Sequence, residues 1–217
     1  MIGLPRPCLM LVTDRRRLAP EARTPAAELI ALDAQLDEAI AAGVDIVQVR
    51  ERDLDAGVLT AFVRRLVSRA GGTRVLVNDR ADVALAGGAN GVHLRSESPP
   101  ASRVRTMDAG WIIGRSVHEG DEVMTRTESA DYLLFGAVFP TASKAVPSAG
   151  VTALGAVARQ SRVPVLAIGG ITPEGALACA AAGATGVAAI GLFLPPGRTP
   201  EALGAGEAVR RLRAMLE

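Results

Sequence analysis

Four segments of the chain share one pattern, in which a small-residue helix end is followed at once by a short apolar strand. Glycine at a helix end adopts the left-handed conformation without a Cβ penalty, so the chain can turn directly into the strand. Four polar residues mark the repeats at intervals of 45, 41 and 54 residues: Asp45, Asn90, Asp131 and Thr185. These intervals are too long for one strand–helix unit and suit two, so the repeat predicts eight units.

The predicted strands are short continuous apolar runs rich in Val, Ile and Leu, which are typical of strands buried on both faces of a parallel sheet. They cover residues 9–13, 46–50, 75–78, 91–94, 112–116, 132–135, 165–168 and 186–190. The predicted helices cover residues 28–41, 55–70, 80–86, 152–160, 173–182 and 200–216, with a further one from about residue 101, delayed by two prolines.

Eight alternating units without linker-like composition predict one compact domain over residues 1–217, of the α/β class and with a (β/α)8 TIM-barrel fold. The alternative is an open doubly wound sheet, which would not require so regular a repeat.

Composition excludes several classes of function. The chain has 24 Lys+Arg against 23 Asp+Glu and only six aromatic residues, which disfavours nucleic-acid binding. No apolar run reaches the ~18–20 residues of a membrane span, and the basic cluster at 15–17 follows the first apolar stretch, the reverse of a secretion signal. Cys8 and Cys179 lie in apolar segments, which favours small buried side chains in a reduced, cytoplasmic protein.

Polar residues begin abruptly where the predicted strands end, which is the edge of a barrel that carries active sites. Gln48, Arg50 and Arg52 alternate, so they are expected to share the interior face, where they would meet an anionic or polar ligand. A buried network with Glu51 or Asp79 is the structural alternative.

The last two strands are followed by glycines. Gly169 and Gly170 lead into a predicted helix, and Gly191 follows the final strand. Glycine lets backbone N–H groups approach a phosphate, and these two loops are the usual phosphate site of this fold. The alternative is a tight turn that needs glycine for geometry alone.

Both histidines lie at predicted strand ends. His93 is inside an apolar run and is expected to be a satisfied core or rim residue, whereas His118 follows a strand on a loop. An imidazole there is suited to proton transfer near neutral pH, although a plain surface-loop histidine is the alternative.

The interval between Asp131 and Thr185 is 54 residues, longer than the other two. Its additional residues fall in 136–150, a polar loop that contains Thr141 and Lys144. Such a loop over the mouth of a barrel is expected to act as a mobile lid. Lys144 could contact a substrate anion, or remain a solvated lysine.

Six motifs then occur in order along nearly the whole chain. They are QVRER at 48–52, VNDR at 77–80, GVHL at 91–94, GRSVH at 114–118, ADYLLFGAVFPT at 130–141 and AIGGITP at 167–173. With them the chain resembles the thiamine phosphate synthase/TenI superfamily, whose members are (β/α)8 barrels with two known activities.

The first implied activity is that of the synthases, which join hydroxymethylpyrimidine diphosphate to a thiazole phosphate with Mg²⁺ held by two aspartates. The first aspartate would correspond to Asp79, but the second position is Ser98 in the segment RSES. A serine hydroxyl lacks the negative charge that a dication bridging a diphosphate requires, unless Glu97 substitutes. The lid motif T-x-T-K of these enzymes is TASK here, a mild departure.

The second implied activity is that of the TenI-like thiazole tautomerases, which shift a proton in a thiazole carboxylate phosphate and need no metal. The resemblance places the acid/base group at His118 and phosphate at the three glycines, with Arg50 or Arg52 facing the carboxylate. The remaining expected substrate contacts are Gln48, Asn78, Ser116, Thr141 and Lys144.

Tautomerase activity without a cofactor is therefore the preferred prediction for this chain, with a small-molecule thiazole phosphate as its partner and neither nucleic acid nor membrane. A synthase with an altered Mg²⁺ site is the first alternative, and a non-catalytic phosphate-ligand binder or regulatory protein is the second. The oligomeric state stays open, since barrels of this type often pair through helix faces.

Overall fold

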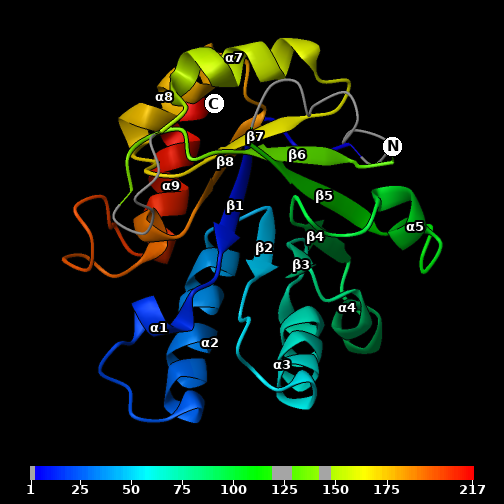
Figure 1. The fold of residues 1–217 in the computed structure, drawn as a ribbon. Coiled ribbons are helices and arrows are strands. Elements are labelled where there is room, and N and C mark those ends of the chain that lie inside the picture. The colour runs from blue at the N-terminus through cyan, green and yellow to red at the C-terminus, as the bar shows by residue number, and fades with distance from the viewer. Residues whose placement is uncertain (1–2, 119–128, 142–147) are drawn as a thin grey trace.

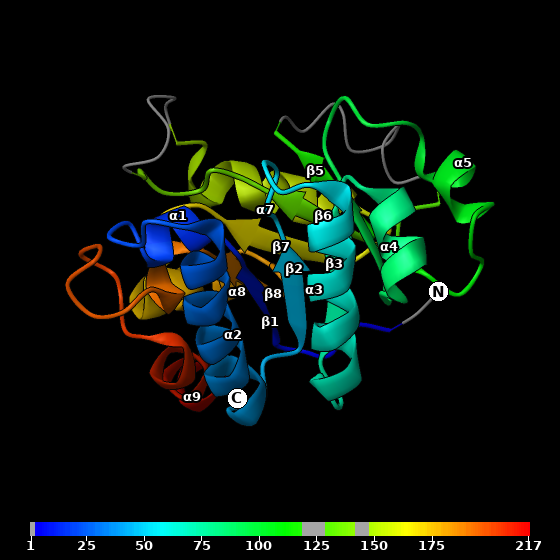
Figure 2. The same ribbon diagram turned by 90° about the horizontal axis from the view of Figure 1, so that it is seen from below.

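The computed structural model describes residues 3–118, 129–141 and 148–217. Its eight strands are parallel and form a closed barrel in chain order, with the helices outside the ring (Figures 1 and 2). The strands are β1 Cys8–Val12, β2 Ile46–Val49, β3 Arg74–Asn78, β4 Gly91–Leu94, β5 Ile112–Val117, β6 Tyr132–Phe135, β7 Val165–Ile168 and β8 Gly186–Ala189. The predicted (β/α)8 barrel is confirmed, and the open sheet is excluded because β1 pairs with β8.

The helices follow the predicted order, with small differences at their ends. They are α1 Arg15–Leu18, α2 Pro25–Ala41, α3 Ala56–Arg69, α4 Ala81–Gly87, α5 Ala101–Arg105, α7 Gly150–Gln160, α8 Pro173–Ala181 and α9 Ala205–Leu216, with a 3₁₀ turn η2 at Gly191–Phe193. The predictions missed α1 and η2. The last helix begins five residues later than predicted, because Gly204 has φ +83° and a right-handed helix cannot run through it.

The repeat that predicted the barrel has a physical cause in the structure. Three of its marker side chains accept a hydrogen bond from the backbone N–H of the preceding strand. These bonds join Asp45 Oδ2 to Leu9 at 2.7 Å, Asn90 Oδ1 to Val75 at 2.8 Å and Asp131 Oδ2 to Ile113 at 2.8 Å. Each marker also donates its own N–H to the carbonyl of the same strand residue. At these three markers a side-chain oxygen is therefore used at the point where the next strand enters the barrel.

Apolar residues form two separate layers. The larger one lies between the strands and the surrounding helices, and the smaller one fills the barrel interior. The fully buried Tyr132 is the largest residue of the inner layer, and it faces Gly114 across the β5–β6 pair. A Cβ on Gly114 would overlap the tyrosine ring, so the glycine makes the space that the ring occupies.

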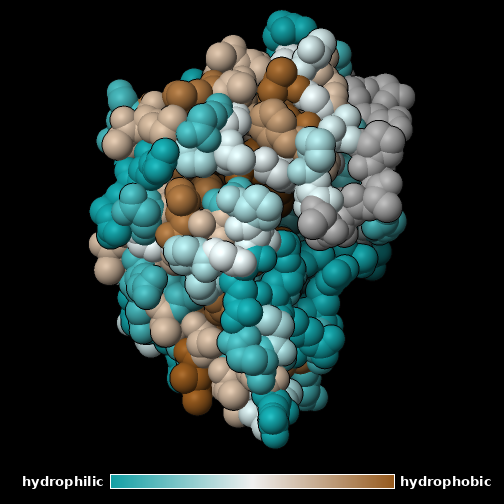
Figure 3. All heavy atoms as spheres, turned by 90° about the vertical axis from the view of Figure 1, so that its left-hand side faces the viewer, coloured by the Kyte–Doolittle hydropathy of each residue, from teal (hydrophilic) through white to brown (hydrophobic). Residues whose placement is uncertain are grey.

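The outer surface mixes hydrophilic and hydrophobic residues, as the face in Figure 3 shows. Among the described residues, five large hydrophobic side chains are exposed, on or beside five different helices: Ile30, Val58, Leu85, Met107 and Leu177. Within the described ranges, no helix is long and apolar enough to cross a membrane. Cys8 and Cys179 are both buried and unpaired, as predicted.

Candidate active site

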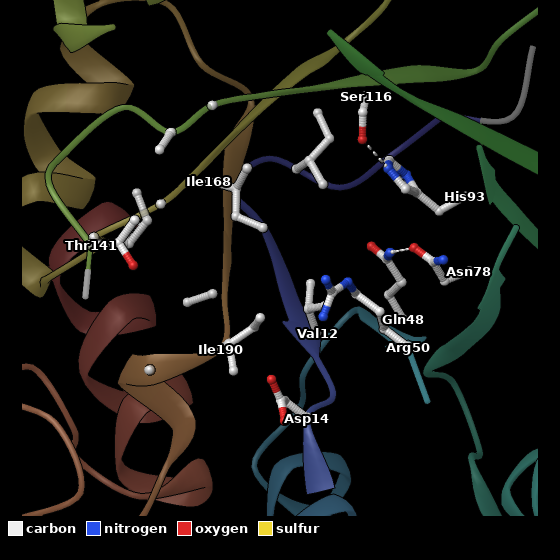
Figure 4. Close-up of a pocket in the computed structure, with 18 of the residues that line it drawn as sticks. Val12, Asp14, Gln48, Arg50, Asn78, His93, Ser116, Thr141, Ile168 and Ile190 are labelled. Carbon is white, nitrogen blue, oxygen red and sulfur yellow. Dashed lines mark hydrogen bonds between the residues drawn. The ribbon is translucent and has the colours of Figure 1, made fainter. Parts of the chain in front are cut away.

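A cavity of about 520 Å³ opens at the carboxyl ends of the strands. Residues from both halves of the chain line it, with Arg50 and Asn78 across the cavity from Thr141 (Figure 4). Ten of the eleven residues predicted to contact a ligand border this one cavity: Gln48, Arg50, Arg52, Asn78, Ser116, His118, Thr141, Gly169, Gly170 and Gly191. The eleventh, Lys144, lies outside the described residues, as does the middle of the predicted lid at 136–150.

His118 lies just beyond β5, at the exposed mouth of the cavity. Its Nδ1 is 2.7 Å from the carbonyl oxygen of Gly136, which follows the neighbouring strand β6. Because a carbonyl oxygen can only accept, Nδ1 must carry the proton and donate it. In the neutral ring the lone pair is therefore on Nε2, the atom that can act as a base.

His93 is fully buried and forms a chain of hydrogen bonds with two neighbours. Its Nδ1 is 3.0 Å from the Tyr132 hydroxyl, and its Nε2 is 2.9 Å from Oγ of Ser116. Desolvation lowers the pKa of His93 to about 3, so the ring is neutral at pH 7. The prediction of a satisfied core histidine agrees with these contacts, and the ring forms part of the cavity floor.

The protonation state of Tyr132 determines which groups donate and which accept in this series of hydrogen bonds. Burial raises the pKa of its phenol well above the usual value, so it keeps its proton, and His93 Nδ1 is the acceptor within reach. The single N–H of the neutral ring is then on Nε2, which donates to Oγ of Ser116. Ser116 is left with its own hydroxyl proton to donate, and it borders the cavity.

Gln48 and Asn78 form a second polar pair on the cavity wall. Nε2 of Gln48 donates to Oδ1 of Asn78 at 2.9 Å (Figure 4). Oε1 of Gln48 finds no hydrogen-bond partner in the part of the chain that the structure describes, although the residue is 2% exposed. A buried carbonyl oxygen without a partner is costly. The pair is therefore arranged for a ligand that supplies the missing hydrogen bond.

Arg50 extends its half-buried side chain into the cavity (Figure 4). Desolvation and the nearby charge of Arg52 lower its pKa, so its charged form would be stabilised by an anion. Within the described ranges its guanidinium has no hydrogen-bonded or ion-paired partner. The position of Arg50 therefore fits the predicted contact with a ligand anion.

The alternative of a buried network with Glu51 applies to a different arginine. Glu51 is not among the residues that line the cavity, and its Oε2 accepts from Nη1 of the buried Arg15 at 2.9 Å. Arg15 is also paired with Asp53 and Glu28, at 2.6 and 2.7 Å. These ion pairs hold the loop after β2 in place. Arg50 takes no part in them and faces the cavity.

The glycine loops after β7 and β8 border the opposite wall. Gly169 and Gly170 have φ of +102° and +62°, and a Cβ on either would come within 2.6–2.8 Å of Ala137 or Phe139. Among the residues that the structure describes, the N–H groups of Gly169, Gly170 and Gly191 donate to no protein acceptor. Turn geometry explains the glycines, but three unused donors on one cavity also suit an oxyanion. Figure 4 shows Ile168 and Ile190, which precede these loops, on this wall.

Asp79 does not have the surroundings of a metal ligand. Its Oδ2 accepts from Nε of Arg95 at 2.8 Å and lies 2.7 Å from Nη2, while its Oδ1 accepts from the Ser98 hydroxyl. Glu97 is exposed and accepts from Oγ of Ser96. No three His, Cys, Asp or Glu residues within the described ranges are grouped so that they could hold a metal ion. These residues do not fit the Mg²⁺ site that the resemblance implies for a synthase.

Sequence reasoning missed several residues of the cavity. Arg95, Asp14 and Arg17 line it, and Tyr132 acts on it through His93. Arg95 and Asp14 were visible as polar residues at strand ends. Nothing in the apolar run around Tyr132 indicated that its hydroxyl reaches a histidine.

Comparisons with known proteins identify the family of the chain. A family model described as thiamine monophosphate synthase matches residues 9–193. A "Putative thiamine-phosphate synthase" of Geobacter sulfurreducens is 39% identical over 193 residues, covering 86% of each chain. The "Thiamine-phosphate synthase" of Anaeromyxobacter dehalogenans is 41% identical, covering 72% of this chain and 73% of its own.

A solved structure is similar over almost the whole length. The "Thiamine phosphate pyrophosphorylase from Pyrococcus furiosus" aligns with a TM-score of 0.77 and 27% identity, covering 96% of this chain and 95% of its own. The family model, the relatives and the shared barrel lead to one assignment. The chain belongs to the thiamine phosphate synthase/TenI family of thiamine-biosynthesis enzymes.

Proposed function

We propose that this chain is a thiazole tautomerase, which converts a thiazole carboxylate phosphate to its aromatic tautomer without a metal ion. The observation that carries the proposal is the hydrogen bond from His118 Nδ1 to the Gly136 carbonyl. It holds the neutral ring with a basic Nε2, as a proton-shift reaction requires.

The reaction needs one proton carrier and a fixed substrate. Nε2 of His118 removes a proton from one position of the heterocycle and returns it at another, so no atom is gained or lost. The imidazolium formed between the two steps keeps its Nδ1–H bond to Gly136, which stabilises the positive charge.

The cavity walls supply the two anchors that the substrate requires. The N–H groups of the three glycines are suited to its phosphate, and Arg50 is suited to its carboxylate. The Ser116 hydroxyl, oriented through His93, can donate a hydrogen bond to the ring or the carboxylate.

The test compares two reactions on one protein preparation. The first assay follows tautomerisation by the ultraviolet absorbance of the aromatic product, in EDTA-treated buffer. His118→Gln should lower kcat by about 10²–10⁴-fold with little change in the affinity for phosphate. Equal activity of the wild type and the variant would remove His118 from the mechanism.

Thiamine phosphate synthase activity is the second candidate, because the relatives carry the name thiamine-phosphate synthase. The second assay therefore supplies hydroxymethylpyrimidine diphosphate, thiazole phosphate and Mg²⁺. Release of diphosphate together with formation of thiamine phosphate would refute the tautomerase proposal. Binding of the thiazole phosphate with neither reaction would instead indicate a non-catalytic ligand-binding protein.

A further inference from the structure

The loop after β4 closes onto Asp79, which follows β3. The Ser98 hydroxyl donates to Oδ1 of Asp79 and accepts from the backbone N–H of Arg95 at 2.8 Å. The N–H of Ser98 in turn donates to the Arg95 carbonyl at 3.2 Å. Both oxygens of the carboxylate thus meet donors from one four-residue loop.

This arrangement is the opposite of what a divalent cation needs. Mg²⁺ binds oxygen lone pairs at about 2.0–2.1 Å in octahedral geometry. At Asp79 a guanidinium occupies one oxygen and a hydroxyl proton the other, and Ser98 is 7% exposed, with no charge to contribute. A metal ion would have to displace a positive group that already neutralises the carboxylate.

We propose that Arg95 is the resident cation of this site: its guanidinium takes the place of a divalent ion at Asp79 and contacts the anionic ligand. A guanidinium has five N–H donors, and the hydrogen bond to Asp79 uses the one on Nε, while Nη2 lies 2.7 Å from the same oxygen as an ion pair. The side chain is half exposed and borders the cavity, so the remaining donors are available to a ligand. Asp79 is then a positioning residue for Arg95. The ligand-contact part rests on the proposed function, whereas the metal-exclusion part does not.

The metal-exclusion part is tested with Mn²⁺ alone, whose free concentration is measured by electron paramagnetic resonance. The wild type should bind no Mn²⁺ at Asp79, so that Asp79→Asn leaves the titration unchanged. The double variant Arg95→Gly, Ser98→Asp removes the resident cation and adds a carboxylate, and it should bind Mn²⁺ at least tenfold more tightly than the wild type.

Two results would overturn this part of the proposal. One is Mn²⁺ binding by the wild type that Asp79→Asn abolishes. The other is equal Mn²⁺ affinity of the wild type and of a double variant whose circular dichroism shows it to be folded.

The ligand-contact part is tested by tautomerase kinetics of Arg95→Gln. Losing a partly exposed charge-assisted contact should raise KM about tenfold and change kcat less than threefold, and Arg95→Lys should restore part of the loss. The chain offers a matched control in Arg65, which is 54% exposed and paired with Asp33 on the helix layer. Arg65→Gln should leave KM unchanged.

An unchanged KM in Arg95→Gln, or an equal rise in Arg65→Gln, would show that Arg95 does not contact the substrate. If the wild type has no tautomerase activity, the proposed function fails, while the Mn²⁺ titrations still decide whether Arg95 excludes the metal.

Discussion

The two walls of the cavity bind ligands by different means. On the wall of β7 and β8 the groups available are backbone N–H donors of glycines, whose positions depend on the absence of side chains. On the wall of β2 to β5 they are side chains held in bonded sets, such as Gln48 with Asn78 and His93 with Ser116. A change on the first wall therefore acts through steric overlap, and a change on the second through a lost donor, acceptor or charge.

The largest effect is expected on the glycine wall. In Gly170→Ala the new methyl would overlap the Pro140 carbonyl and come within 2.8 Å of Phe139 Cβ. We expect phosphate affinity to fall by about 100-fold, because the loop must move and its N–H groups move with it. The variant should also lose about 2–4 kcal/mol of unfolding free energy, from overpacking and left-handed strain together. Calorimetric titration with inorganic phosphate and urea unfolding measure the two losses.

Gly71 provides the matched control for this substitution. Its φ is +56°, close to that of Gly170, but nothing lies within 4 Å of an added Cβ. Gly71→Ala should lose about 1–2 kcal/mol from backbone strain alone and bind phosphate normally. If the two variants bound phosphate with equal affinity, the glycine wall would not be the phosphate site.

The barrel and the position of the cavity could both be predicted because each rests on a local feature. The repeat that begins with Asp45 reflects a hydrogen bond made by the side chains of three of its four markers, and polar residues at strand ends mark the edge of the barrel where the site lies. Gly169 and Gly170 could be recognised in the sequence because glycine is the residue that adopts positive φ most readily.

The features that could not be predicted depend on pairs of residues far apart in the chain. Tyr132 fits inside the barrel because Gly114 of the adjacent strand leaves room, which only the strand register reveals. Likewise, the sequence shows Asp79 and Arg95 as two charges 16 residues apart. Their pairing requires the loop after β4 to fold back across the end of β3.

The second-largest effect concerns the wall of β2 to β5 and is a change in the unfolding free energy with pH. The pKa of His93 is about 3 in the folded protein and about 6.5 in the unfolded chain, because burial opposes the charged form. Between these values the unfolded chain binds a proton that the folded protein does not, so stability is lost as the pH falls. From pH 7.5 to pH 5.0 this group should remove about 2 kcal/mol of unfolding free energy.

Urea unfolding of the wild type and of His93→Gln at both pH values isolates this contribution, since the carboxylates are common to both. The pH-dependent loss should be about 2 kcal/mol smaller in His93→Gln, although that variant is less stable at pH 7.5. His118→Gln, which removes the other histidine, should keep the loss that His93 causes. The same pH dependence in the wild type and His93→Gln would mean that His93 is solvated and does not hold Ser116 rigidly.

The smallest effect concerns Glu201, a charged residue that reaches the glycine wall. The Glu201 carboxylate borders the cavity so closely to Gly191 that a Cβ there would overlap its Oε1. A carboxylate beside an oxyanion site repels phosphate, by about 1 kcal/mol at 4 Å in water. Glu201→Gln should therefore tighten phosphate binding by about two- to fivefold, and the gain should shrink as salt is raised. Glu207→Gln, the same charge change on α9, is the control and should have no effect. If Glu201→Gln weakened binding instead, Glu201 would belong to the machinery that holds the ligand, and the glycine wall would not act by backbone donors alone.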